Sequence, residues 1–303
     1  SSADSAYLCL LKKHKSPSMS SPKVFILILN YNGKATLADC LRSVYRTHYP
    51  NFEVVVIDNH SQDGSFEAAR QLFPRAHFIQ NTANLGFSAG NNVGIRFVLQ
   101  HGAQYVWLLN NDATIKPNTL SRLIATSQRY SRSGILSPLI LHSKSKDIWF
   151  TGGAIKWLSM KTVHTPLRSL DTPIPSGYIC GCAMLIKRSV LEQVGLFDER
   201  FFLYYEDADL SLRAKQKGFQ LLVVPSARAY HSETSVHNPK KIYWLVFSGL
   251  QFFNKHTHRF LRPWYTVFFF ARRIKNVFDV QFRPTTTAKQ VAHAYQDFLN
   301  LPH

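Results

Sequence analysis

Short apolar runs alternate with amphipathic stretches along the N-terminal half of the chain. The runs at 24–29, 53–57, 76–79 and 105–109 consist almost entirely of hydrophobic residues, which is typical of strands buried on both faces of a parallel sheet. Between them, stretches such as 35–45 place leucines and a valine on one helical face. The alternation predicts an α/β fold with a mostly parallel central sheet.

Polar side chains directly follow three of these predicted strands. They are Asn30, Tyr31 and Asn32 after the first strand, Asp58 after the second, and Asn110, Asn111 and Asp112 after the fourth. A tight turn would explain any one of these groups. Three groups at equivalent positions instead predict a binding cleft at the carboxyl edge of the sheet, where open α/β sheets bind ligands.

The remaining elements follow from turn residues and helix ends. The stretch 84–92 is rich in Gly and Asn and predicts a turn that leads into a helix ending near Leu99. Residues 176–187 predict a strand kinked by glycine, and 220–224 a strand stopped by Pro225. Residues 206–218 predict a helix, with acids in its first turn and cations near its final glycine.

Composition narrows the function classes only in part. With 45% hydrophobic residues the chain is not disordered, and 36 basic against 18 acidic residues give a net charge of +18. Such a charge favours polyanionic partners, namely nucleic acid, anionic lipid or phosphorylated ligands. The four cysteines form no CxxC pair, which argues against a disulfide framework or a structural zinc site and favours a reducing compartment.

The chain divides into three predicted parts: an N-terminal tail over 1–21, a main domain over 22–235 and a helical region over 236–303. In the tail an apolar patch precedes the lysines, the reverse of a secretory signal. Met19 is interpreted either as the start of translation, with 1–18 an upstream extension, or as an internal methionine.

The last part carries ten basic and two acidic residues interleaved with aromatics. No uninterrupted apolar run there is long enough to span a bilayer. We therefore expect helices that lie on an anionic membrane surface. A helical cap that is merely basic is the alternative, and a nucleic-acid patch is the least favoured interpretation.

Six ordered motifs resemble the inverting family 2 glycosyltransferases with the GT-A fold, and most of all the bacterial rhamnosyltransferase-type members. The motifs are LNYN at 29–32, IDNHSQDGS at 57–65, NLGFSAGNNVGI at 84–95, LLNNDA at 108–113, GCAMLIKR at 181–188 and FDERFFLYYEDADLSLR at 197–213. The resemblance covers roughly residues 23–235.

The resemblance implies a nucleotide site. Asp58 would accept a hydrogen bond from the base of the donor, although a strand-end turn also explains an acid there. Asn84, Gly86 and Asn91 would form a turn that lets the backbone approach the nucleotide. Asn30, Tyr31, Asn32, Asn110 and Asn111 would line the same site. The donor would be a dTDP-sugar, with dTDP-rhamnose favoured, or else a UDP-sugar.

The resemblance also implies a divalent metal, Mn²⁺ or Mg²⁺, that offsets the charge of the donor diphosphate. The segment from Asn110 to Asp112 corresponds to the DxD motif of the family, but Asn110 replaces the first acid. Only Asp112 then offers a charged ligand, and His231 is expected to join it. A lone histidine can equally be an ordinary surface or core residue.

The ED pair of the family places the general base at Asp207. Glu206 and Asp209 would orient the acceptor and the helix, and Gly181, Cys182 and Ala183 would line the sugar and acceptor site. Simple enrichment of acids in the first helical turn is the alternative interpretation.

Together these expectations describe a metal-dependent inverting glycosyltransferase. Its acceptor would be a lipid-linked saccharide, and the enzyme would be peripheral on the cytoplasmic face of the cell membrane. The competing hypothesis is a non-catalytic protein that binds nucleotide sugars or polyanions.

Overall fold

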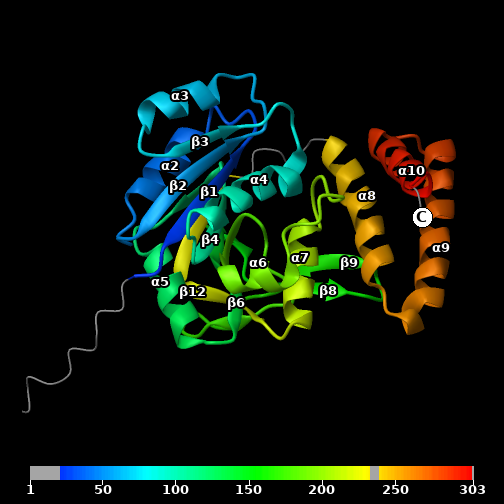
Figure 1. Ribbon diagram of the computed structural model, residues 1–303. Helices are drawn as coiled ribbons and strands as arrows, with labels where there is room; N and C mark the ends of the chain where they lie inside the picture. Colours follow the sequence, from blue (N-terminus) through cyan, green and yellow to red (C-terminus); the bar gives the residue numbers. More distant parts are fainter. Residues whose placement is uncertain (1–20, 233–238, 302–303) are drawn as a thin grey trace, which may run out of the picture.

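A ten-stranded mixed sheet forms the centre of the molecule (Figure 1). The computed structural model describes residues 21–232 and 239–301. The strand order is β10-β12-β6-β11-β4-β1-β2-β3, with β5 and β7 paired to β12 and β6. The strands are β1 (Val24–Asn30), β2 (Phe52–Asp58), β3 (His77–Gln80), β4 (Tyr105–Asn110), β5 (Ala113–Ile115), β6 (Ser133–His142), β7 (Ile148–Phe150), β10 (Ile174–Pro175), β11 (Ala183–Lys187) and β12 (Gln220–His231).

Strands β4, β1, β2 and β3 run parallel, as the continuous apolar runs predict. The side chains of β1 from Val24 to Ile28 are fully buried, because helices cover both faces of a sheet whose strands are joined by helical crossovers. Strand β11 lies antiparallel between β4 and β6. A separate hairpin consists of β8 (Gly153–Lys156) and β9 (Lys161–His164).

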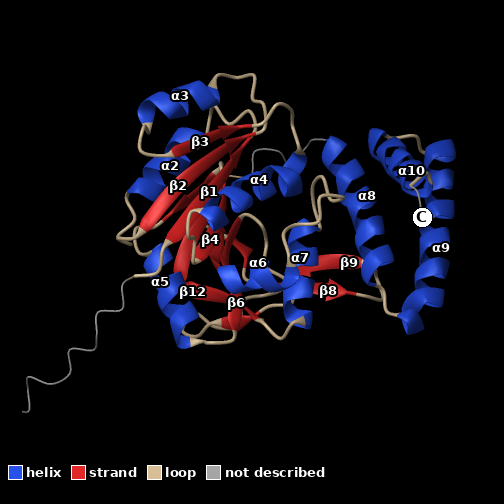
Figure 2. Ribbon diagram, in the orientation of Figure 1, coloured by secondary structure: helices blue, strands red, loops and turns tan. Residues whose placement is uncertain are grey.

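Helices alternate with the strands along the main domain (Figure 2). They are α2 (Leu37–Tyr45), α3 (Ser65–Leu72), α4 (Gly86–Gln100), α5 (Thr119–Arg129), α6 (Arg188–Val194) and α7 (Glu206–Gln216). The predicted α/β class is therefore confirmed.

Three boundaries differ from the predictions. Helix α4 already begins at Gly86, so most of the predicted turn at 84–92 is helical. Strand β12 continues beyond Pro225 because its register with β6 is interrupted between Val224 and Arg228, and such an irregularity tolerates a proline. The predicted strand at 176–187 is regular only from Ala183 onward.

Three long helices stand beside the main domain: α8 (Pro239–His256), α9 (Arg262–Phe282) and α10 (Thr286–Leu299), with the short η1 (Arg259–Leu261) between the first two. Helix α8 lies between the main domain and α9 (Figure 1). Phe247, Phe269, Tyr295 and Phe298 form a small second core that joins the three helices. None of the helices in the described residues is long and apolar enough to cross a membrane.

The predicted division of the chain stays a prediction. The boundary at 235–236 falls between the described stretches, and the two interpretations of Met19 concern residues outside them.

Candidate active site

The polar groups after β1, β2 and β4 meet at one edge of the sheet. Asn30 lies opposite Asp58 in the pairing of β1 with β2, and Leu29 lies opposite Asn110 in the pairing with β4. Nδ2 of Asn30 donates to Oδ1 of Asp58 at 2.8 Å. Oδ1 of Asn30 accepts from Nδ2 of Asn111 at 2.9 Å. The structure therefore brings the three predicted groups together.

Asp58 is completely buried at this edge. Its Oδ2 accepts from the backbone N of Ser61 at 2.8 Å and its Oδ1 from the Ser61 hydroxyl at 2.6 Å, which is the geometry of a strand-end turn. The Ser61 hydroxyl oxygen also accepts from the backbone N of Asn32 at 2.9 Å. Asp58 thus ties the loops after β1 and β2 together, while Tyr31 beside them is half exposed.

The segment with Asn84, Gly86 and Asn91 shapes the start of α4. Oδ1 of Asn84 accepts from the backbone N of Gly86 at 3.0 Å. Gly86 has φ +77°, and a Cβ there would lie 2.4 Å from the carbonyl oxygen of Phe202. Asn91 is buried, and its Nδ2 donates to the carbonyl of Phe87 at 2.9 Å. The close approach that Gly86 permits is therefore to the protein backbone, where we expected a nucleotide.

Asp112 and His231 lie close together because the end of the long strand β12 pairs antiparallel with the short strand β5, with His231 opposite Ala113. Nε2 of His231 lies 3.2 Å from Oδ1 of Asp112. Within the described residues neither this oxygen nor Nδ1 of His231 has a hydrogen-bond partner, although both are buried. The structure thus brings the two predicted metal ligands together.

A carboxylate oxygen and an imidazole nitrogen both suit Mn²⁺, and the oxygen also suits Mg²⁺. No group of three or more His, Cys, Asp or Glu in the described ranges could enclose an ion. The pair therefore fits a cation whose other ligands come from a bound molecule or from water.

Asp207 lies in the first turn of α7 and is partly exposed. Its Oδ2 accepts from the backbone N of Gly181 at 3.0 Å, and its Oδ1 accepts from the backbone N of Ala208 at 2.7 Å. Burial raises the pKa of Asp207 above its ordinary value, although these two N–H groups and the nearby His164 oppose the rise. The carboxylate is thus held in place and is more basic than an ordinary aspartate.

The segment from Gly181 to Ala183 connects Asp207 to the sheet edge. A Cβ on Gly181 would lie 2.9 Å from the ring of Phe87, so a larger residue there would have to displace that ring. Cys182 and Ala183 are buried, and the carbonyl of Cys182 accepts from the backbone N of Asn110 at 2.9 Å. Two backbone hydrogen bonds, at Gly181 and at Asn110, therefore link the candidate base to the Asn110–Asp112 segment.

The two neighbouring acids lie in different surroundings. Glu206 is buried, and burial followed by the charge of Asp207 raises its pKa well above the ordinary value, so its neutral form is favoured. Asp209 is fully buried and contacts Arg213 at 2.7 Å, Lys255 at 2.5 Å and His256 at 2.7 Å. Although burial alone would raise the pKa of Asp209, these partners hold it below its ordinary value. Asp209 therefore orients the helices, while its predicted part in orienting the acceptor gains no support from these contacts.

Two successive tyrosines precede these acids with left-handed backbone, Tyr204 at φ +69° and Tyr205 at φ +68°. Non-glycine residues adopt this conformation rarely, and it persists where the surroundings enforce it. The Tyr205 ring packs against Phe252 and Phe253 of α8, with centroids 5.3 and 5.9 Å apart. Helix α8 therefore helps to hold the turn that presents Asp207.

Two residues near the candidate site had no sequence motif to reveal them. The Trp149 ring lies edge-on to both His231 and His164, with centroids 4.6 and 5.2 Å apart. His164 comes from the β8–β9 hairpin and lies close enough to Asp207 to lower its pKa. Only the folded structure brings Trp149 and His164 between the candidate metal ligands and the candidate base.

A mixed sheet flanked by helices, with an anchored carboxylate at the carboxyl edge of its parallel strands, is the architecture of an α/β protein that binds a ligand at that edge. The family model described as Glycosyl transferase family 2 matches residues 25–195. The chain therefore belongs to glycosyl transferase family 2, as the ordered motifs indicate.

Curated relatives include two rhamnosyltransferases. An N-acetylglucosaminyl-diphospho-decaprenol L-rhamnosyltransferase of Mycobacterium tuberculosis is 30% identical over 204 residues, which cover 59% of this chain and 66% of the relative. The chain thus spans slightly less than two thirds of that relative's length. The dTDP-rhamnosyl transferase RfbF of Shigella flexneri is 22% identical over 237 residues, which cover 74% of this chain and 77% of the relative.

Solved structures share the fold. The mannosyltransferase PcManGT of Pyrobaculum calidifontis, in complex with GDP-Man and Mn²⁺, has a TM-score of 0.60 at 16% identity and covers 97% of this chain and 93% of its own. GalNAc-T7, with UDP, GalNAc and Mn²⁺, has a TM-score of 0.61 at 18% identity and covers 88% of this chain and 59% of its own. The GT-A fold implied by the motifs is confirmed.

Proposed function

We propose that this protein is an inverting glycosyltransferase that moves a sugar from a nucleotide-diphosphate donor to an acceptor hydroxyl. One observation carries the proposal: a partly exposed carboxylate, Asp207, is anchored by two backbone N–H groups and linked through Gly181 and Cys182 to the segment that holds Asp112. Family membership supports the reaction class.

Asp207 serves as the general base. Inversion needs one group that removes the proton of the acceptor hydroxyl while the hydroxyl oxygen attacks the anomeric carbon. The N–H groups of Gly181 and Ala208 fix the orientation of the carboxylate, and its raised pKa strengthens it as a base. The neutral form of Glu206 adds no second negative charge beside it.

Asp112 and His231 hold a divalent cation together with the donor diphosphate. Oδ1 of Asp112, which has no hydrogen-bond partner within the described residues, and its 3.2 Å distance from Nε2 of His231 support the assignment, since a neutral imidazole nitrogen can ligate a metal. Such a cation supplies positive charge that stabilises the leaving nucleoside diphosphate. Asn110 and Asn111 position this segment, and Asn111 does so through Asn30.

The donor is dTDP-rhamnose in first place and a UDP-sugar in second. Two curated relatives are rhamnosyltransferases, which favours rhamnose. The acceptor is a saccharide linked through a diphosphate to a lipid, since the name of the mycobacterial relative describes such an acceptor. Asp58, with Asn30, Tyr31 and Asn32 beside it, shapes the nucleotide side of the site. Asn84, Gly86 and Asn91 fix the start of α4.

The decisive test is the replacement Asp207→Asn, which keeps the shape of the side chain and removes the proton acceptor. Loss of a general base costs roughly 10²–10⁴-fold in rate. We expect that loss in a transfer assay with dTDP-rhamnose and a lipid-diphosphate saccharide, with donor affinity unchanged. Transfer within threefold of the wild type would contradict the assignment.

The competing hypothesis, a protein that binds nucleotide sugars or polyanions without catalysis, rests on the net charge of +18 and on Asn110 in place of an acid. The same assay separates the two, because a binding protein would retain the donor and neither transfer nor hydrolyse its sugar with or without Mn²⁺.

A further inference from the structure

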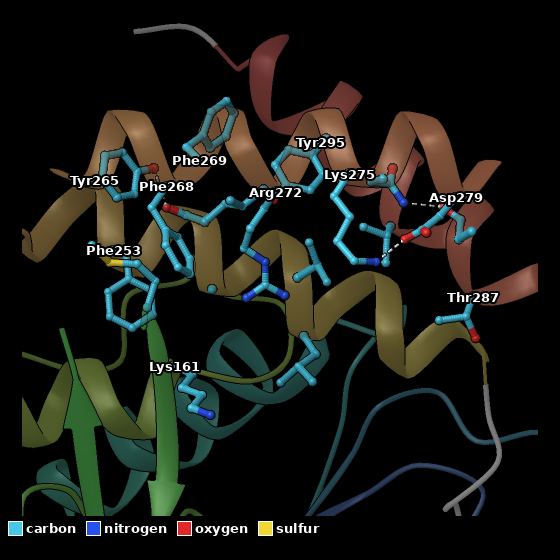
Figure 3. Close-up of a pocket in the computed structure, with 18 of the residues that line it drawn as sticks. Lys161, Phe253, Tyr265, Phe268, Phe269, Arg272, Lys275, Asp279, Thr287 and Tyr295 are labelled. Carbon is cyan, nitrogen blue, oxygen red and sulfur yellow. Dashed lines mark hydrogen bonds and ion pairs between the residues drawn. The ribbon is translucent and has the colours of Figure 1, made fainter. Parts of the chain in front are cut away.

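A large apolar cavity lies between the main domain and the C-terminal helices (Figure 3). Its volume is about 880 Å³, which is within the range of sites that bury a small organic ligand. The walls come from α8, α9 and α10, with the turn before α7 and the start of β9 at the inner side. The apolar wall includes Tyr205, Leu250, Phe253, Phe268, Phe269 and Tyr295.

Three cations at the wall of this cavity, Lys161, Arg272 and Arg283, are exposed and form no ion pair within the described ranges. Arg272 reaches from α9 toward the side where Lys161 lies (Figure 3). Within the described ranges neither side chain forms an ion pair, and the Arg272 guanidinium lies 5.5 Å from the centroid of the Phe268 ring. By contrast, Lys275 at the cavity wall is neutralised by Asp279 at 2.5 Å. The apolar cavity is therefore bordered by exposed cations that no acid neutralises within the described ranges.

The inner wall of the cavity leads to the candidate base. Tyr205 lines the cavity and stands two residues before Asp207. Burial raises the pKa of Tyr205, and the charges of Asp207 and Arg272 act on it with opposite signs. The cavity wall at Tyr205 therefore lies two residues along the chain from the candidate base.

We infer that this cavity binds the lipid part of the acceptor, with a diphosphate at Arg272 and Lys161 and the hydrocarbon chain along α8, α9 and α10. The inference rests on the proposed function for the nature of the acceptor. Its physical basis is independent: burying a hydrocarbon chain against aromatic walls is favourable, and a guanidinium pairs with phosphate oxygens through two parallel hydrogen bonds.

The test uses farnesyl diphosphate as a soluble probe, kept below its micellar concentration and measured by calorimetry with the full chain in EDTA. We expect saturable binding, and far weaker binding of farnesol and of inorganic pyrophosphate, each of which offers only half of the interactions. Equal binding of pyrophosphate would mean a free-phosphate site, and equal binding of farnesol a purely apolar one. Either result, or no binding of farnesyl diphosphate, would overturn the inference.

Arg272→Gln should weaken farnesyl diphosphate binding about tenfold or more, because a hydrogen-bonded charge is lost. Lys289→Gln removes one positive charge from α10 outside the cavity wall and serves as the matched control, with binding expected within twofold of the wild type. Val291→Trp fills the cavity from α10 and should reduce binding while the melting temperature shows that the variant folds. Unchanged affinity in Arg272→Gln would contradict the inference.

Further measurements test separately where the prenyl probe binds and whether the proposed function is right. A photoreactive analogue of farnesyl diphosphate should crosslink to 243–256, 265–283 or 285–298, and crosslinks confined to the Asp112 region would refute the cavity as the site. UDP binding with Mn²⁺ should be the same in Arg272→Gln and the wild type. If Asp207→Asn kept its transfer activity while the prenyl probe still bound, the proposed base would fail and the lipid site would stand.

Discussion

Glu206 is buried with one carboxyl oxygen, Oε2, that has no hydrogen-bond partner among the described residues. A buried carboxylate without partners is costly, so the group retains its proton well above its ordinary pKa of 4.5. The neutral acid also spares Asp207 a second charge at close range. Glu206 thus supports the candidate base Asp207, but it lowers the stability of the fold at high pH, where its buried carboxyl group must ionise.

Glu206→Gln should therefore stabilise the protein at alkaline pH. The folded-state pKa of Glu206 is raised, so its contribution to stability is complete below pH 4.5 and is lost as the pH rises through the folded-state value. We expect a gain of about 1–3 kcal/mol in the free energy of unfolding at pH 9 and almost none at pH 4. Urea denaturation at both pH values measures it, with Glu192→Gln in an exposed ion pair as the control. A gain that is equal at both pH values would contradict the protonated state.

A second prediction concerns Asp112 and His231, the two candidate metal ligands. Asp112→Ala removes the only charged ligand and should abolish the effect of Mn²⁺ on donor affinity, while His231→Ala should weaken that effect less. Calorimetry of UDP binding with and without Mn²⁺ measures both, and Asp39→Ala, at an exposed position on α2, is the control. If UDP binds the wild type equally well without metal, Asp112 and His231 have another role.

At the scale of the elements, Asp209 joins α7 to α8. Its fully buried carboxylate contacts Arg213 on its own helix and both Lys255 and His256 on α8. Nearby, Phe252 and Phe253 of α8 pack on Tyr205. The helix that completes the proposed lipid site therefore also supports the turn that carries Asp207.

Asp209→Ala should loosen α8 and destabilise the protein by about 3–5 kcal/mol, because removal of one partner leaves buried cations uncompensated. The wild-type contribution is present above the unfolded-state pKa near 3.8 and is lost as the pH falls through the lower folded-state value. Denaturant unfolding measures the cost, and hydrogen exchange should show faster exchange in α8. Asp198→Ala, which removes the partly exposed acid that also contacts Lys255, is the comparison and should cost less. Exchange in α8 at the wild-type rate would exclude this role.

At the scale of the whole molecule, the outer side of the C-terminal region is apolar. Large apolar side chains on η1 and α9 are exposed to solvent: Phe260, Trp264, Val267, Phe270, Ile274, Val277, Phe278 and Phe282. Exposed apolar surface of this extent marks an interaction site. Arg273 and Arg259 are close to it in sequence, and the region is strongly basic. This arrangement supports our prediction that the region docks on an anionic membrane.

Membrane docking should combine a salt-sensitive and a salt-resistant part, since each basic residue contributes about 1 kcal/mol and apolar burial does not depend on ions. In co-sedimentation we expect strong binding to anionic vesicles, partial release at high salt and weak binding to neutral vesicles. Phe270→Ser with Phe278→Ser should remove the salt-resistant part, and Arg273→Glu should weaken the rest. Leu72→Ser, at an exposed apolar position on α3, is the control. Equal binding to neutral and anionic vesicles would exclude the electrostatic part, and no binding to either would exclude docking.

The sequence by itself determined the parallel strands and the gathering of Asn30, Asp58 and Asn110 at one edge. Both follow from local patterns, since continuous apolar runs define buried strands and parallel pairing aligns their carboxyl ends. The motifs also identified the family. The sequence also identified the acids of α7 as a group, but it did not predict the direction in which each of them faces.

Tertiary structure decided those directions. Successive helical residues point about 100° apart, so Glu206, Asp207 and Asp209 enter different surroundings, and α8 converts Asp209 into a buried structural ion pair. Contacts between distant segments likewise placed His231 beside Asp112 and brought Trp149 and His164 into the site. The cavity at Arg272 exists only where three helices meet the main domain, because such a space depends on packing between elements and leaves no periodic pattern in the chain.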